Sequence, residues 1–249
     1  MIIRFDGKVV AVSGAGHGFG REIARTFARL GALVFATDLS ADTLEETASS
    51  GGITVRALDL RDRVAGAEWI SRIETQTGRA IDVLVNNAGI AAGSSLLDME
   101  VETWDQVLNV NLKGAWLVAR ATAKHMIASN TRGSIINVSS VLGSAVQKGT
   151  GNYPAAKAAL THLTRCMAVE WARFGIRVNA LAPGYFATDL SASYLESAQG
   201  SAMLKRIPQR RLGSPDELSG ALLLLASQAS NYMTGCVVTV DGGLALPVI

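Results

Sequence analysis

The stretch that decides the fold is "KVVAVSGAGHGFGREIARTFARLG", residues 8–31. Its first six residues form an apolar, β-branched run of the kind found in buried strands. From Arg21 onward apolar residues recur at helical spacing, and the pattern ends on Gly31, where a glycine commonly closes a helix. A strand, a glycine-rich loop and a helix therefore follow one another, as in the first half of a β-α-β unit.

The same alternation continues along the rest of the chain. These runs are apolar on both faces, as in a parallel sheet that is covered by helices, and the connections of such units are right-handed. The sequence therefore predicts a doubly wound α/β sheet without linkers or repeats. We interpret the least regular segment, 188–212, as a loop or helical insertion that covers the substrate. The further strands are expected at 32–38, 53–59, 81–89, 133–140, 176–184 and 235–243.

Composition narrows the class of protein. The 249 residues carry a formal net charge of +2, and only 18% of them are charged, which argues against disorder and against a dedicated nucleic-acid-binding protein. Cys166 and Cys236 form no C-x-x-C motif and the three histidines are scattered, so no metal site is expected. Without an export signal or an apolar run that could span a bilayer, we expect a cytoplasmic protein that does not bind membranes.

The glycine-rich loop is a candidate nucleotide site. Glycine permits positive φ and lets the backbone approach a pyrophosphate, while the next helix offers free N–H groups and the positive end of its dipole. The spacing differs from the commoner G-x-G-x-x-G pattern, and a flexible turn is the alternative. The position between strand and helix favours a nucleotide, and the candidate residues are Ser13, Gly14, Gly16, His17, Gly18, Phe19 and Gly20.

Asp38 ends the second predicted strand and bears on the choice of cofactor. A carboxylate there can accept hydrogen bonds from the adenosine ribose hydroxyls and would repel a 2′-phosphate. We therefore expect NAD rather than NADP. His17 favours NADP instead, because a basic group in the phosphate loop could contact a 2′-phosphate. Histidine is, however, mostly neutral at pH 7. Asp38 could also cap the next helix, but Ser40 can do so instead.

Further motifs follow the glycine loop in a specific order, and together they resemble the short-chain dehydrogenase/reductase family over essentially the whole chain. They are "NNAG" at 86–89, "NVNLKG" at 109–114, "INVSS" at 136–140, "YPAAK" at 153–157, "APGYFAT" at 182–188 and "VDGG" at 240–243. The resemblance implies one Rossmann-like domain over residues 1–249 with a seven-stranded parallel sheet. It also implies hydride transfer between nicotinamide and an alcohol or carbonyl, in a homotetramer or homodimer.

The resemblance also implies further cofactor contacts. Asp59 would meet the adenine, the "NNAG" backbone would line the adenosine side, and Thr188 with the preceding "PG" would hold the nicotinamide ribose and carboxamide. The cofactor-binding candidates that this adds are Leu39, Asp59, Leu60, Asn87, Ala88, Gly89, Pro183, Gly184, Phe186 and Thr188, together with Tyr153 and Lys157.

Tyr153 and Lys157 lie four residues apart and are the candidate acid/base pair. A tyrosinate could take the proton of an alcohol as its hydride leaves, provided that its pKa falls toward neutrality. A cation at i+4 shares the helix face, and at about 4 Å and an effective dielectric of about 20 it attracts a phenolate by roughly 4 kcal/mol. Roughly 4 kcal/mol corresponds to the three pKa units required, while desolvation opposes the shift. Pro154 fits early in a helix and places Tyr153 at the helix entrance.

Two more side chains complete the expected catalytic set. Ser140 ends the fifth predicted strand, and its hydroxyl could bind the substrate oxygen together with Tyr153. Ser139 is the rival, and the spacing in the family favours Ser140. By the same resemblance Asn111, within the helical segment 103–129, holds a water that links Lys157 to solvent.

Three hypotheses about the function remain open. The first is NAD-linked oxidation of a secondary alcohol or polyol, or reduction of the matching ketone. The second is NADP(H)-dependent reduction of a 3-oxoacyl thioester on an acyl-carrier protein, which the basic run "KRIPQRR" at 205–211 could attract; a solvated turn is the simpler explanation of that run. The third is a nucleotide-binding regulator without catalysis, which the presence of both Tyr153 and Lys157 disfavours.

Overall fold

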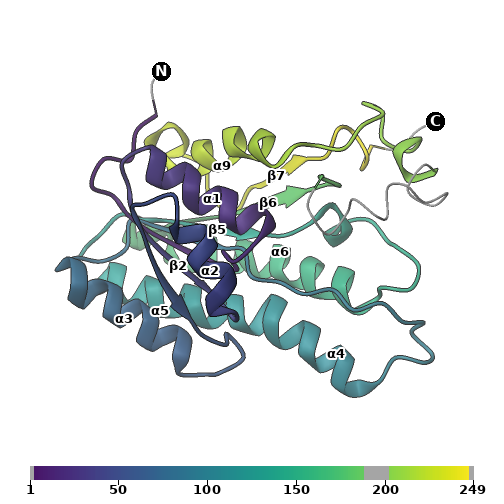
Figure 1. Ribbon diagram of the computed structural model, residues 1–249, viewed down its shortest axis with the longest axis horizontal. Helices are drawn as coiled ribbons and strands as arrows, with labels where there is room; N and C mark the ends of the chain where they lie inside the picture. The colour runs from purple at the N-terminus through teal and green to yellow at the C-terminus, as the bar shows by residue number, and fades with distance from the viewer. Residues whose placement is uncertain (1–2, 188–201, 247–249) are drawn as a thin grey trace.

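Seven parallel strands form one sheet in the order β3-β2-β1-β4-β5-β6-β7 in the computed structural model, which describes residues 3–187 and 202–246 (Figure 1). Every pairing between neighbouring strands is parallel. The doubly wound α/β sheet predicted from the sequence is confirmed. The strands are β1 (Val9–Ser13), β2 (Leu33–Asp38), β3 (Ile53–Ala57), β4 (Val83–Asn86), β5 (Ser134–Val138), β6 (Arg177–Pro183) and β7 (Val237–Val240).

Helices cover both faces of the sheet. In Figure 1, α1 and α9 lie above the sheet, and α3 and α5 lie below it. Residues of β1 show why both faces need cover: Val10 and Val12 pack into the core on one side, whereas Val9 and Ala11 pack on the other. One face carries α1 (Gly18–Arg29), α2 (Ala41–Ala48) and α9 (Ser219–Ala226), and the other carries α3 (Ala65–Thr77), α5 (Ala115–Ala128) and α6 (Asn152–Trp171).

The direction of winding reverses between β1 and β4, which places the functional residues. β1 pairs with β2 on one side and with β4 on the other, so the connections from these two central strands leave in opposite directions. Ligands of such sheets bind in the crevice beyond the carboxyl ends of the strands at this point. The loops that follow β1 and β4 border that crevice, and both contain predicted cofactor residues.

The helical segment predicted over 103–129 is interrupted in its middle. The structure has α4 (Val101–Leu108), a π-helical segment (Asn109–Gly114) and then α5. The helix widens where the Asn111 side chain bonds the Ile90 backbone and where Gly114 packs closely on the Leu60 carbonyl oxygen. Such bulges are frequent at functional sites, and the apolar periodicity of the sequence does not signal them.

None of the helices in residues 3–187 and 202–246 combines the length and apolarity that crossing a lipid bilayer requires.

Candidate active site

The loop after β1 packs directly against the loop after β4. Gly14 has φ +67°, and a Cβ built on it would lie 2.5 Å from the Cα of Ala88, so a larger residue is excluded on both grounds. The Ser13 hydroxyl accepts hydrogen bonds from the N–H groups of Asn87 at 3.1 Å and Ala88 at 3.2 Å. The Asn87 amide donates to the Gly14 carbonyl at 2.8 Å. Ser13 and Asn87 thus join the two loops that border the crevice.

Helix α1 presents an uncapped N-terminus at the same place. His17 is its N-cap residue and makes no side-chain cap hydrogen bond. A Cβ built on Gly20 would lie 1.9 Å from the Gly14 carbonyl oxygen, so glycine is needed to bring the helix this close to the loop. Uncapped N–H groups and the positive end of a helix dipole are the features that bind phosphate. The arrangement fits the pyrophosphate of a dinucleotide.

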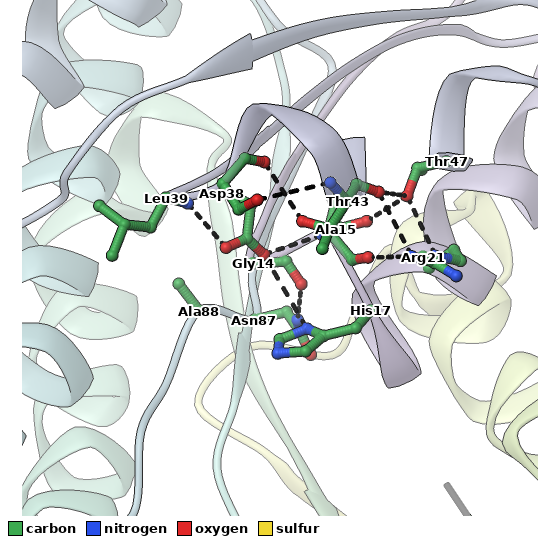
Figure 2. Close-up of polar contacts among 12 residues, drawn as sticks. Gly14, Ala15, His17, Arg21, Asp38, Leu39, Thr43, Thr47, Asn87 and Ala88 are labelled. Atoms are coloured by element: carbon green, nitrogen blue, oxygen red, sulfur yellow. Dashed lines mark hydrogen bonds and ion pairs between the residues drawn. The ribbon is translucent and has the colours of Figure 1, made fainter. Parts of the chain in front are cut away.

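Asp38 reaches back from the end of β2 to the glycine loop (Figure 2). Its carboxylate accepts hydrogen bonds from Gly16 N–H at 2.8 Å and from Leu39 N–H at 2.7 Å. The His17 Nδ1 atom lies 4.0 Å from the same carboxylate. The Asp38 carboxylate remains partly accessible beside the glycine loop, with 17% of the side chain exposed.

Arg21 links the glycine loop to α2, a role that the sequence did not reveal (Figure 2). Its guanidinium donates to the Gly16 carbonyl and, at 3.3 Å, to the Thr43 carbonyl of α2. Thr47 of α2 donates to the Ala15 carbonyl at 2.7 Å. Arg21 of α1 and Thr47 of α2 thus fix the Gly16 and Ala15 carbonyls and hold the loop in position.

The residues expected on the adenine side are Leu39, Asp59 and Leu60. The Asp59 carboxylate is held by a two-pronged contact with the Arg61 guanidinium, and this hydrogen bonding lowers the pKa of Asp59. The Leu60 side chain packs into the core below the sheet, so only its backbone is available to a ligand. The Leu39 side chain is exposed. An adenine contact by Asp59 therefore has to share this carboxylate with Arg61.

On the opposite side of the crevice, two aromatic rings connect the glycine loop to the chain after β6. Phe19 and Phe186 meet edge to face, with ring centroids 5.0 Å apart. Pro183 ends β6, and Gly184 donates from its N–H to the Val240 carbonyl of β7 at 2.8 Å. Thr188 lies outside the described residues.

Tyr153 and Ser140 come together beyond the end of β5. The Ser140 side chain lies close enough to the Tyr153 phenol to lower its pKa, and Ser140 Oγ accepts a hydrogen bond from Leu142 N–H at 3.1 Å. Ser139 faces the other way, because its hydroxyl donates to the Lys157 carbonyl at 3.1 Å and lies 2.7 Å from Thr161 Oγ1. Of the two rival serines, the structure places Ser140 beside Tyr153 and packs Ser139 against α6.

Lys157 is buried beside the tyrosine. Its Nζ atom donates to the Val138 carbonyl at 2.8 Å and lies 5.6 Å from the centroid of the Tyr153 ring. Burial lowers the pKa of Lys157 to about 8. Burial also raises the pKa of Tyr153, while the Ser140 side chain opposes that shift. Without a cofactor, the protein therefore does not lower the pKa of Tyr153 toward 7, because desolvation outweighs the effect of Ser140.

Asn111 joins this group from the π-helical segment. Its Oδ1 accepts from Ile90 N–H at 2.8 Å, and its Nδ2 donates to the Ile90 carbonyl at 2.9 Å. A Cβ built on Gly89 would lie 3.3 Å from both Asn111 Oδ1 and Lys157 Nζ. Gly89 thus lies between the two side chains, and all four predicted catalytic residues belong to one end of the sheet.

A cavity of about 280 Å³ adjoins this group, and its wall begins one residue after Ser140. The cavity is lined mainly by apolar side chains, among them Val141, Leu142, Val146 and Met203. Tyr185 and Arg206 also line it. Met203 and Arg206 belong to the segment 188–212 that we interpreted as the substrate cover, whereas nothing in the sequence pointed to Val141, Leu142 and Val146.

Comparison with known proteins agrees with this geometry. The family model described as Enoyl-(Acyl carrier protein) reductase matches residues 14–245. The chain therefore belongs to the short-chain dehydrogenase/reductase family, whose members are oxidoreductases that bind a nicotinamide cofactor.

Individual relatives span nearly the whole chain. The 3-oxoacyl-[acyl-carrier-protein] reductase FabG of Thermotoga maritima is 41% identical and covers 98% of this chain and 100% of its own length. The galactitol 2-dehydrogenase (L-tagatose-forming) of Cereibacter sphaeroides is 39% identical and covers 97% and 96%. A crystal structure of a gluconate 5-dehydrogenase from Burkholderia cenocepacia, in complex with NADP and tartrate, is 36% identical, covers 99% and 98%, and superposes with a TM-score of 0.91.

Proposed function

We propose that the protein oxidises a secondary alcohol or polyol with NAD, or reduces the matching ketone, and that Tyr153 is the acid/base. The observation that carries this proposal is the Tyr153 phenol, which lies beside Ser140 and the buried Lys157 ammonium next to the cavity. The galactitol and gluconate dehydrogenases among the relatives support this class of substrate.

Each side chain has one task in this proposal. Tyr153 takes the hydroxyl proton of the alcohol, while the carbinol carbon loses a hydride and becomes a carbonyl carbon. Ser140 donates a hydrogen bond to the substrate oxygen, and Lys157 stabilises the phenolate. The nicotinamide, when bound, accepts the hydride and in its oxidised form adds a positive charge near Tyr153. That charge acts in the direction needed to offset the rise in the pKa of Tyr153 that burial causes.

The preference for NAD rests on Asp38. We expect its carboxylate to face the adenosine ribose, where it would repel a 2′-phosphate. The Burkholderia relative contains NADP, so the two indications differ. We expect kcat/KM with NAD to exceed that with NADP for the same alcohol, and Asp38→Ser to reduce this ratio at least tenfold. A higher kcat/KM with NADP in the unaltered enzyme would refute the preference.

A second candidate is NADP(H)-dependent reduction of a 3-oxoacyl thioester, which the Thermotoga relative favours. The basic run that could attract an acyl-carrier protein is partly neutralised, because Arg211 forms an ion pair with Glu217 at 2.6 Å.

A panel of polyols, secondary alcohols and 3-oxoacyl thioesters, assayed with both cofactors, separates these activities. Faster turnover of thioesters than of any polyol would replace the first proposal by the second. Tight NADH binding without turnover of any compound would instead indicate the nucleotide-binding regulator.

A further inference from the structure

The cavity beside Ser140 contains one charged side chain among its described lining residues. Arg206 lies in a wall that is otherwise formed largely by apolar groups such as Val141, Val146 and Met203. Arg206 is exposed at the edge of the cavity, and its guanidinium can pair with a planar anion such as a carboxylate through two parallel hydrogen bonds.

The Arg206 guanidinium also makes no hydrogen bond or ion pair within residues 3–187 and 202–246. Its neighbours differ in this respect. Arg211 pairs with Glu217 through two contacts of 2.6 and 2.7 Å, and Arg210 donates to the Lys205 carbonyl. Within the basic run, Arg206 thus combines a place in the cavity wall with a charge that these residues leave uncompensated.

Resting on the proposed function, we propose that Arg206 binds the carboxylate of the substrate and that the substrate is a small hydroxy acid or the matching keto acid. The secondary hydroxyl lies at Tyr153 and Ser140, and the carboxylate lies at Arg206. A cavity of about 280 Å³ suits an acid of four to six carbons.

The remaining polar groups of the cavity suit the other hydroxyls of such an acid. The Tyr185 hydroxyl donates to Gln147 Oε1 at 3.0 Å, and both side chains line the cavity. Together they offer donors and acceptors between the two ends of the substrate. A plain hydrocarbon alcohol would offer no partner to these groups or to the Arg206 charge.

The test compares matched acids and polyols in three forms of the enzyme. The pairs are gluconate with glucitol and galactonate with galactitol, each with NAD and with NADP. The variants are Arg206→Gln and, as control, Lys205→Gln, which removes the same charge one residue earlier from an exposed side chain outside the cavity lining. We expect a higher kcat/KM for the acids, and a fall of about ten- to a hundredfold in the acid-to-polyol ratio in Arg206→Gln only. An equal loss for acids and polyols, or an equal effect of Lys205→Gln, would overturn the proposal.

Two further measurements separate this inference from the proposed function. The first is calorimetric binding of gluconate and galactonate to the enzyme–NADH complex, which needs no turnover. Binding that Arg206→Gln abolishes supports the inference even if no polyol is oxidised. Absence of binding overturns the inference. The second is a pair of thioester assays, which reveal whether Arg206 binds a phosphate of the substrate rather than a carboxylate. If Arg206→Gln slows reduction of a 3-oxoacyl-coenzyme A but not of its N-acetylcysteamine analogue, which lacks phosphate, Arg206 serves a phosphate and the carboxylate assignment is wrong.

Discussion

Burial opposes the charged forms of both Tyr153 and Lys157, because it favours a neutral phenol and a neutral amine. Burial raises the pKa of the tyrosine and lowers that of the lysine to about 8. At neutral pH the lysine is still mostly protonated, so its ammonium remains available to stabilise a phenolate. We infer that the pair is destabilised in the free protein and is organised for a state in which a negative charge forms on Tyr153.

Replacing Lys157 by methionine should therefore stabilise the fold and abolish turnover. Because the pKa of Lys157 is lowered from 10.5 to about 8, its charge is unfavourable below pH 8, by about 3 kcal/mol. The variant also loses the bond to the Val138 carbonyl, which is worth about 1 kcal/mol. Urea unfolding at pH 7 should show a net gain of about 1–2 kcal/mol. The gain should shrink between pH 8 and 10, where folded Lys157 loses its proton and the unfavourable buried charge disappears from the unaltered protein. A variant that is less stable than the unaltered protein at pH 7 contradicts the account.

The neighbouring serines provide a matched pair. Ser140→Ala should lower kcat about ten- to a hundredfold, because it removes a hydrogen bond to the reacting oxygen, and should cost about 1 kcal/mol of stability through the lost bond from Leu142 N–H. Ser139→Ala should lower the free energy of unfolding by about 1 kcal/mol and leave kcat within threefold, because its bonds run to α6. Steady-state rates distinguish the two variants, and urea unfolding measures their loss of stability. A large loss of kcat in Ser139→Ala but not in Ser140→Ala would show that Ser139 is the catalytic serine.

At the scale of elements, the glycine loop is fixed by contacts within the protein. Gly20→Ala would place a Cβ 1.9 Å from the Gly14 carbonyl oxygen and should lower stability by about 1–3 kcal/mol and weaken NADH binding. Gly220→Ala in α9 is the control, because no heavy atom lies within 4 Å of its Cβ and stability should rise by up to about 1 kcal/mol. Thermal unfolding and NADH fluorescence measure both effects. Equal behaviour of the two variants would refute the packing argument.

The strands and the order of the motifs could be predicted because apolar runs and glycine positions are local features of the sequence. The π-helical segment could not, since it depends on hydrogen bonds between the Asn111 side chain and the backbone of Ile90, which lies 21 residues earlier in the chain. The environment of Lys157 and the roles of Arg21 and Arg206 likewise depend on contacts between distant segments. The catalytic and cofactor-binding assignments, Thr188 included, stay predictions, although the structure brings Asn111, Ser140, Tyr153 and Lys157 together.

At the scale of the molecule, we expect association. Val169 on α6 is 81% exposed and Trp116 on α5 is partly exposed, which leaves apolar surface on both helices. Light scattering should give a mass well above the 26.1 kDa of one chain, as for a homodimer or homotetramer. Val169→Glu should shift the protein toward that single-chain mass. A monomer at micromolar concentration in the unaltered protein would refute the expectation.

The central claim, proton exchange by Tyr153 beside the cofactor, is tested most directly by Tyr153→Phe, which removes one hydroxyl group. The measurement is kcat on the best alcohol from the panel, together with NADH affinity by fluorescence. We predict that kcat falls about a hundred- to ten-thousandfold, while NADH affinity stays within about threefold because the glycine loop and Asp38 are untouched. An unchanged kcat in a variant that binds NADH normally would contradict the account.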